Sequence, residues 1–234
     1  MLNFSFQNTT KILFGEGQIQ AISQAIPKDA KVLVTYGGGS IKTNGVYDQI
    51  VAALSEHTWF EFSGIEPNPS YETLMKALDP IREHGIDFLL AVGGGSVVDG
   101  TKFIAAAAVF EGDDPWDFVA KGQPITKALP LACVLTLPAT GSEANIGAVV
   151  TRDGNKLPLF AVLDPAVTLS LSDRQISNGV VDAFIHTMEQ YLTYSVNGKV
   201  QDRFAEGLLL TLIEEGPKAL AVETKNDLAI RGNI

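Results

Sequence analysis

Short runs of β-branched and aromatic residues alternate with helix-forming segments through the first two thirds of the chain. The pattern predicts strands at 31–36, 58–62, 87–92, 131–137 and 159–163, with helices at 46–54, 71–83 (broken near Pro80) and 97–109. Strands that alternate with helices pair in parallel, and helices cover both faces of the resulting sheet. The sequence therefore predicts an α/β fold.

The alternation of strand and helix patterns ends at Asp173, and from there the chain is expected to be helical. Helices are predicted at 175–193 and 199–220, without a strand between or after them. We therefore expect one domain over residues 1–172 and the start of a second, helical domain over 173–234. Two helices bury little apolar surface, so the helical domain is expected to be truncated here and to continue in the natural protein.

The composition of the chain argues against several classes of protein, including nucleic-acid-binding, membrane and secreted proteins. Of the 234 residues, 46% are hydrophobic, which is enough for a sizeable core. The net charge is −10 and lysine and arginine do not cluster, which argues against nucleic-acid binding. No apolar run reaches the roughly 20 residues of a membrane span, and the start lacks the order of a secretion signal. Cys133 is the single cysteine and is expected to be a buried thiol. These features favour a cytoplasmic enzyme.

Two short alternating runs, FSFQN and KILFG, precede the first predicted strand–helix unit. An exposed N-terminal strand needs a pairing partner, which is either its own sheet or another subunit. We favour a homodimer on this ground.

Two predicted strands end in the same motif, Gly-Gly-Gly-Ser, at Gly37–Ser40 and at Gly93–Ser96. Glycines at the carboxyl end of a parallel strand let the backbone approach a ligand, and the following helix directs free N–H groups and its positive end there. Neither loop matches the GxGxxG fingerprint. Glycine runs also simply permit tight turns. Two such loops on adjacent strands favour an anionic ligand such as a pyrophosphate.

Polar residues follow the second loop and the strand that contains Cys133. Asp99 lies three residues beyond Ser96, where its carboxylate is expected either to cap the helix or to orient a ligand. The hydroxyl-rich turn 136–145 offers donors for phosphate or ribose oxygens, although serine and threonine are also common turn formers. The donors in this turn are Thr140, Ser142 and Asn145.

Asp182 and His186 are spaced i,i+4 in the helix predicted at 175–193. This spacing places a carboxylate and an imidazole one turn apart on the same face, where both can bind a divalent cation. A polar stripe of this kind is also what any amphipathic surface helix shows. Two ligands cannot complete a metal site, so further donors would have to come from beyond Ile234 or from another chain.

Several segments together resemble the iron-containing (group III) alcohol dehydrogenase family, in particular its NADPH-dependent aldehyde reductase and butanol dehydrogenase branch. The segments are TTKILFGEG, VTYGGGSIKTNGVYDQ, GIEPNPSYETL, LLAVGGGSVVDGTKFIA, LTLPATGSEAN, FAVLDP and NGVVDAFIHTMEQYLT. The resemblance implies a Rossmann-like parallel-sheet domain, followed by an all-helical metal-binding domain, with a small alcohol or aldehyde substrate in the cleft between them. It also implies hydride transfer between NADP(H) and that substrate, assisted by Fe²⁺ or Zn²⁺.

The resemblance also assigns roles to individual residues. Gly38 and Ser40 would lie near the adenosine ribose, Asn68 would line the cofactor cleft, and Asp182 and His186 would be two of four metal ligands. The pyrophosphate would be held by Gly94, Gly95, Ser96 and Asp99. The remainder of the cofactor site would be lined by Thr136, Thr140, Ser142, Asn145 and Lys156.

The sequence departs from the family pattern in two places. The connection from Lys156 to Asp164 is shorter than in the family, so either a loop has been deleted or residues are missing from the sequence. The two remaining ligand histidines, expected on later helices, are absent. The 234 residues are thus expected to bind the cofactor and to be inactive without the full metal site.

NADP(H) is the expected cofactor rather than NAD(H). NAD-selective sites place an acidic residue at the end of the second strand, where it accepts the ribose 2′-OH and repels a 2′-phosphate. Here that strand ends in Tyr36 and the glycine loop without an acid, and Lys42 follows.

Two other functions fit part of the pattern. Dehydroquinate-synthase-like lyases resemble this family in fold, use NAD transiently and bind a metal, but their phosphorylated substrate calls for more basic residues than this chain carries. A catalytically incomplete nucleotide-binding module is the second alternative, because the later helices are absent.

Overall fold

The computed structural model describes residues 10–121, 124–138, 141–145, 147–150, 160–163, 165–192 and 198–234. The chain divides into two compact units. The sheet unit comprises Asn8–Thr136 and Gly141–Asp164, and the helical unit comprises Met1–Gln7, Leu137–Thr140 and Pro165–Ile234. Each unit is described by itself.

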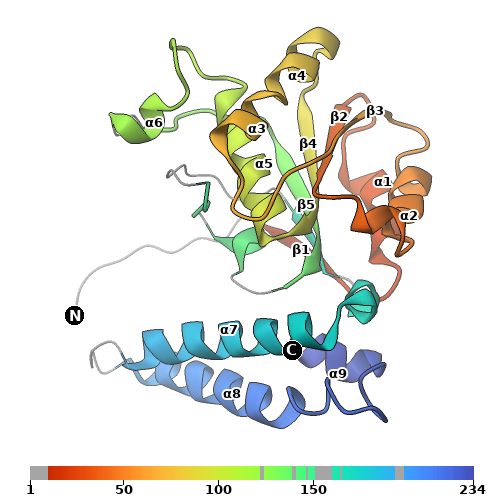
Figure 1. The fold of residues 1–234 in the computed structure, drawn as a ribbon, viewed down its shortest axis with the longest axis vertical. Coiled ribbons are helices and arrows are strands. Elements are labelled where there is room, and N and C mark those ends of the chain that lie inside the picture. The colour runs from red at the N-terminus through yellow and green to blue at the C-terminus, as the bar shows by residue number, and fades with distance from the viewer. Residues whose placement is uncertain are drawn as a thin grey trace. The chain divides into compact units, whose positions relative to one another are not determined.

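Within the described residues, six strands form one sheet in the order β1-β6-β5-β4-β2-β3 (Figure 1). They are β1 (Lys11–Phe14), β2 (Lys31–Tyr36), β3 (Thr58–Phe62), β4 (Phe88–Gly94), β5 (Leu131–Leu137) and β6 (Phe160–Leu163). The pairs β1–β6, β5–β6, β2–β4 and β2–β3 are all parallel. The predicted α/β fold with a parallel sheet is confirmed.

Helices connect the strands of the sheet unit. They are α1 (Ile22–Ala25), α2 (Val46–Ala53), α3 (Tyr71–Met75), α4 (Leu78–His84), α5 (Gly95–Ala107) and α6 (Asp117–Ala120). In Figure 1, α1 and α2 lie together beside β2 and β3, whereas α3, α4 and α5 lie together beside β4 and β5. Apolar side chains of α3, α4 and α5 form one buried core with β4 and β5. Cys133 of β5 belongs to this core, and its burial raises the pKa of the thiol, as expected of a structural cysteine.

The order of the strands places a topological switch point between β2 and β4. From β2 the chain proceeds to β3 at one edge of the sheet, whereas from β4 it proceeds to β5 on the opposite side. In open α/β sheets, ligands bind at the carboxyl ends of the strands at such a point, because the two connections diverge there. Both glycine loops begin at this point.

The segment predicted at 71–83 as a helix broken near Pro80 is two helices. The break falls at Lys76 and Ala77, between α3 and α4, and Pro80 is the third residue of α4. Proline is tolerated in the first turn of a helix, where its missing N–H would have no intrahelical partner. Pro80 also cannot donate to the carbonyl of Lys76, four residues earlier, so the helix is interrupted there and Pro80 lies in the first turn of α4.

The N-terminal strand β1 pairs with β6 of its own chain, with Lys11 opposite Phe160 and Leu13 opposite Val162. The N-terminal strand was expected to pair either with its own sheet or with another subunit. The described KILF segment pairs with the sheet of its own chain. The FSFQN segment lies outside the described residues.

The helical unit contains the short helix η4 (Pro165–Ser170), α7 (Asp173–Leu192), α8 (Lys199–Glu215) and α9 (Leu228–Asn233). Helices α7 and α8 pack side by side (Figure 1). Helix α8 ends at Glu215, five residues earlier than predicted. Gly216 still donates its N–H to the carbonyl of Leu212, but Pro217 has no N–H with which to continue the helix. In the described part of the chain, no helix is both long and apolar enough to cross a membrane.

Candidate functional site

The first glycine loop leaves β2 at the switch point. The carbonyl of Gly37 accepts a hydrogen bond from Gly64 N at 3.1 Å, and a Cβ at Gly37 would lie 3.1 Å from the carbonyl oxygen of Ile65. Gly39 has a φ of 95°, which favours glycine. A Cβ at Gly38 would meet no described atom within 4 Å, so the backbone of Gly38 is open to a ligand. Ser40 follows and begins the short helix η2 (Ser40–Lys42).

The second glycine loop joins β4 directly to α5. A Cβ at Gly93 would lie only 2.6 Å from Cγ2 of Val97, so this position requires glycine. Gly94 is extended, and Gly95 and Ser96 are the first residues of α5, which has no side-chain cap. The first amide groups of this helix therefore lack a capping side chain and lie at its positive end. An anion such as a pyrophosphate fits such a helix start.

Asn68 lies beside the second loop. It has a φ of 54°, and its backbone N–H donates to Oγ of Ser96 at 3.4 Å. The loop that carries Asn68 is anchored by Glu66, which accepts hydrogen bonds from the hydroxyl (2.6 Å) and the backbone N–H (2.9 Å) of Ser70. These bonds lower the pKa of Glu66 to about 2, so its carboxylate stays ionised in this role. The structure thus brings Asn68 and Ser96 together.

Asp99 does not cap α5, contrary to one of the two roles considered for it. It is the fifth residue of the helix, because α5 begins at Gly95, two residues earlier than predicted. Its carboxylate accepts hydrogen bonds from the hydroxyl of Ser142 and, at 2.8 Å, from the backbone N–H of Val149. Asp99 therefore ties α5 to the segment that follows β5.

Lys102 is a residue that the sequence reasoning missed. It is 2% exposed, and its Nζ donates to Oγ of Ser142 (3.0 Å), Oδ1 of Asn145 (3.3 Å) and the carbonyl of Gly147 (2.6 Å). The Nζ also lies 3.7 Å from Oδ1 of Asp99. Burial lowers the pKa of Lys102, and the nearby Asp99 carboxylate opposes that shift. Lys102 brings together three predicted site residues, Asp99, Ser142 and Asn145. In the sequence, its i,i+3 spacing from Asp99 was the only sign that it could pair with that carboxylate.

The other predicted cofactor residues are only partly placed. Thr136 is the penultimate residue of β5 and is half-buried at the carboxyl end of that strand. Thr140 and Lys156 lie outside the described residues.

An acid that the sequence reasoning also missed lies close to the first loop. Glu61 of β3 accepts hydrogen bonds from the hydroxyls of Tyr36 (2.5 Å) and Tyr47, and from Nζ of Lys42 at 2.9 Å. NADP(H) was expected because no acidic residue directly follows β2 in the sequence. Glu61 comes from the neighbouring strand, where it pairs with Val34, and only the strand order reveals it.

The predicted metal ligands share one face of α7. Nε2 of His186 lies 3.6 Å from Oδ1 of Asp182, and the two side chains are 51% and 40% exposed. Two atoms that each lie about 2.1 Å from one ion can be at most about 4.2 Å apart, so this pair fits a single cation. Within the described residues, no group of three or more histidine, cysteine, aspartate or glutamate side chains is arranged to hold a metal. The pair therefore supplies part of a coordination shell.

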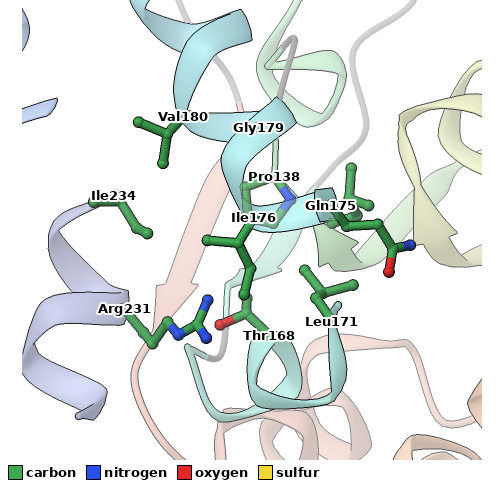
Figure 2. Close-up of a pocket in the computed structure, with 10 residues that line it drawn as sticks. Pro138, Thr168, Leu171, Gln175, Ile176, Gly179, Val180, Arg231 and Ile234 are labelled. Atoms are coloured by element: carbon green, nitrogen blue, oxygen red, sulfur yellow. The ribbon is translucent and has the colours of Figure 1, made fainter. Parts of the chain in front are cut away.

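A small pocket in the helical unit is separate from this pair (Figure 2). Its volume is about 40 Å³. Figure 2 shows the Arg231 guanidinium directed toward Thr168, with Ile176 beside it. Arg231 Nε donates to the carbonyl of Lys225 at 2.8 Å, and Asp182 and His186 do not line the pocket.

An open parallel sheet with two glycine loops at its switch point defines the class of α/β proteins that bind nucleotides at their strand ends. Comparison with known families agrees with this class. The family model described as iron-containing alcohol dehydrogenase matches residues 9–172. The chain belongs to the iron-containing alcohol dehydrogenase family.

Individual relatives are similar over most or all of this chain. The NADPH-dependent aldehyde reductase YqhD of Escherichia coli is 56% identical over 246 aligned residues, which cover 100% of this chain and 63% of the relative. The NADH-dependent butanol dehydrogenase A of Clostridium acetobutylicum is 41% identical, with the same coverage. A crystal structure of E. coli YqhD matches 99% of this chain and 62% of its own, with a TM-score of 0.93 and 54% identity. The chain thus spans a little under two thirds of these relatives.

Proposed function

We propose that this chain supplies the cofactor site and two metal ligands of an oxidoreductase that transfers a hydride between NADP(H) and an alcohol or aldehyde. The observation that carries the proposal is the uncapped start of α5 next to two glycine loops at the switch point. Family membership and the names of the relatives, which are reductases and dehydrogenases, support it over a lyase or a regulatory module.

In this proposal the sheet unit holds the dinucleotide. The amides at Gly94, Gly95 and Ser96 would bind the pyrophosphate, while Gly38 and Ser40 would lie at the adenosine ribose. Asp99 and Ser142, which are hydrogen-bonded to each other, would fix the segment after β5 against α5. The other residues proposed to line the cofactor site are Asn68, Thr136, Thr140, Asn145 and Lys156.

Asp182 and His186 are proposed to hold Fe²⁺ or Zn²⁺, since their donor atoms suit either ion. A bound ion of this kind supplies Lewis acidity, which polarises a carbonyl oxygen. The task of the chain is to orient the dinucleotide and to exclude water. We accordingly assign cofactor binding to residues 1–172 and the metal ligands to the helical residues 173–234.

We further propose a cytoplasmic homodimer. The last strand of the described sheet on one side is β1, and Ile12 and Phe14 of this strand are 50% and 57% exposed. An exposed, apolar edge strand is suited to pairing with a second chain. Light scattering would contradict the dimer by giving the mass of a single chain, and cell fractionation checks the compartment.

The proposed activity is tested with the protein as its gene encodes it, incubated with NADPH, butanal and Fe²⁺ or Zn²⁺. We expect nicotinamide absorbance to fall in step with butanol formation, to stop when a chelator removes the metal and to resume when metal is restored. We also expect NADPH to support faster turnover than NADH at equal concentration. No butanol and no loss of NADPH from the metal-loaded protein would contradict the oxidoreductase, and equal rates with NADPH and NADH would contradict the cofactor assignment.

A further inference from the structure

Lys42 and Glu61 form an ion pair beside the first glycine loop, in a cluster that includes Tyr36 and Tyr47. The pair is 2.9 Å apart, with side chains 44% and 31% exposed. Lys42 lies two residues after Ser40, at the end of η2. Its ammonium group thus sits at the loop that is proposed to contact the adenosine ribose.

The two tyrosine rings hold the lysine in place. Nζ of Lys42 lies 5.1 Å from the ring centre of Tyr36 and 4.5 Å from that of Tyr47. Cations are attracted to aromatic faces at such distances. Hydrogen bonds with Tyr36 and Glu61 raise the pKa of Lys42 above its ordinary value, so the group stays charged at neutral pH.

Glu61 does not depend on the lysine for its hydrogen bonds. Both tyrosine hydroxyls donate to it, one to each carboxylate oxygen. Burial by itself would raise the pKa of Glu61, but the hydrogen bonds from Tyr36, Tyr47 and Lys42 outweigh it and lower the pKa. Lys42 can therefore turn toward another anion, and Glu61 keeps two donors when it does.

We propose that Lys42 recognises the 2′-phosphate of NADP(H), and that Glu61 sets the strength of this preference by competing for Lys42. The inference rests on the proposed dinucleotide site. A phosphate gains a charge-assisted hydrogen bond from Lys42, whereas a neutral 2′-OH gains little. The Glu61 carboxylate offers the same lysine an alternative partner and repels the phosphate, so it moderates the discrimination against NAD(H). One relative is named as NADPH-dependent and another as NADH-dependent, so the choice between the two dinucleotides varies among the relatives.

The test uses two nucleotides that differ only by the phosphate in question, 2′,5′-ADP and 5′-AMP, and measures their dissociation constants by calorimetry on the full chain. Lys42→Met is expected to weaken 2′,5′-ADP binding roughly tenfold or more, the effect of one charge-assisted hydrogen bond, and to leave 5′-AMP within about twofold. Glu61→Gln is expected to increase the preference for 2′,5′-ADP about threefold or more, because the competing charge is gone. Lys42→Arg keeps the cation and should retain the preference.

Matched controls come from the Lys28–Glu56 pair, which is 3.4 Å apart and about 80% exposed. Lys28 precedes β2 and Glu56 precedes β3, so the pair lies at the opposite ends of these strands from the first glycine loop and Glu61. Lys28→Met and Glu56→Gln make the same charge changes and should leave both constants unchanged. Circular dichroism confirms that each variant is folded. An unchanged preference in Lys42→Met, or an unchanged or reduced one in Glu61→Gln, would overturn the inference. Failure of the wild-type chain to bind even 5′-AMP would overturn the dinucleotide site itself, and the inference with it.

Discussion

Replacing His186 with alanine is expected to lower kcat/KM for butanal reduction by roughly 10³-fold or more and to remove the bound metal. The substitution deletes the imidazole that lies 3.6 Å from the Asp182 carboxylate. Loss of residues that merely orient metal ligands costs about 10–100-fold in affinity or activity, and loss of a ligand costs more. Elemental analysis of the purified protein and steady-state kinetics measure the two effects.

His84→Ala is the matched control for this substitution. His84 ends α4 and stacks on Phe60 in the sheet unit, with ring centres 4.1 Å apart. We expect this variant to retain the wild-type metal content and a kcat/KM within about twofold of the wild type. If His186→Ala kept its metal and its activity, the proposed metal pair would be wrong.

Replacing Lys102 with methionine is expected to lower the free energy of unfolding by about 3 kcal/mol. Methionine fills much of the space of the lysine stem but cannot donate a hydrogen bond. The substitution leaves the Asp99 carboxylate, which is 9% exposed, without its cation, and it leaves Asn145 Oδ1 and the Gly147 carbonyl without this donor. A buried group that loses its partner keeps the full cost of its desolvation.

Urea denaturation measures this effect, with Lys121→Met as the control. Lys121 forms an ion pair of 2.7 Å with Asp117, but its side chain is 64% exposed. Surface pairs of this kind contribute at most about 1 kcal/mol. A free energy of unfolding for Lys102→Met within about 0.5 kcal/mol of the wild type would show that the buried network contributes little to stability.

Much of the sheet unit could be predicted because its signals are local. The strands at 31–36, 58–62 and 131–137 match the structure residue for residue. Those at 31–36 and 131–137 are mostly buried and appear in the sequence as nearly continuous apolar runs, whereas the edge strand at 58–62 shows an alternating pattern. The two glycine loops could also be predicted from the repeated Gly-Gly-Gly-Ser motif. The motif is present because the positive φ of Gly39 and the close approach of Gly93 to Val97 both require glycine.

The parts that the sequence did not predict depend on which distant segments meet. Lysine is rarely buried, so Lys102 appeared to be an ordinary helix residue until the segment after β5 was seen to lie against it. Glu61 lies beside the first loop only because β3 is the neighbour of β2, which the order of the strands decides. For the same reason the partners of Asp99 could not be named from its place in the sequence.

The central claim is that the glycine loops at the switch point hold a dinucleotide, and a crystal structure of the protein grown with saturating NADPH tests it most directly. We predict the pyrophosphate at the amides that begin α5, near Gly95 and Ser96, and the adenosine end at Gly38 and Ser40. NADPH bound at another surface, with both glycine loops distant from it, would contradict the claim.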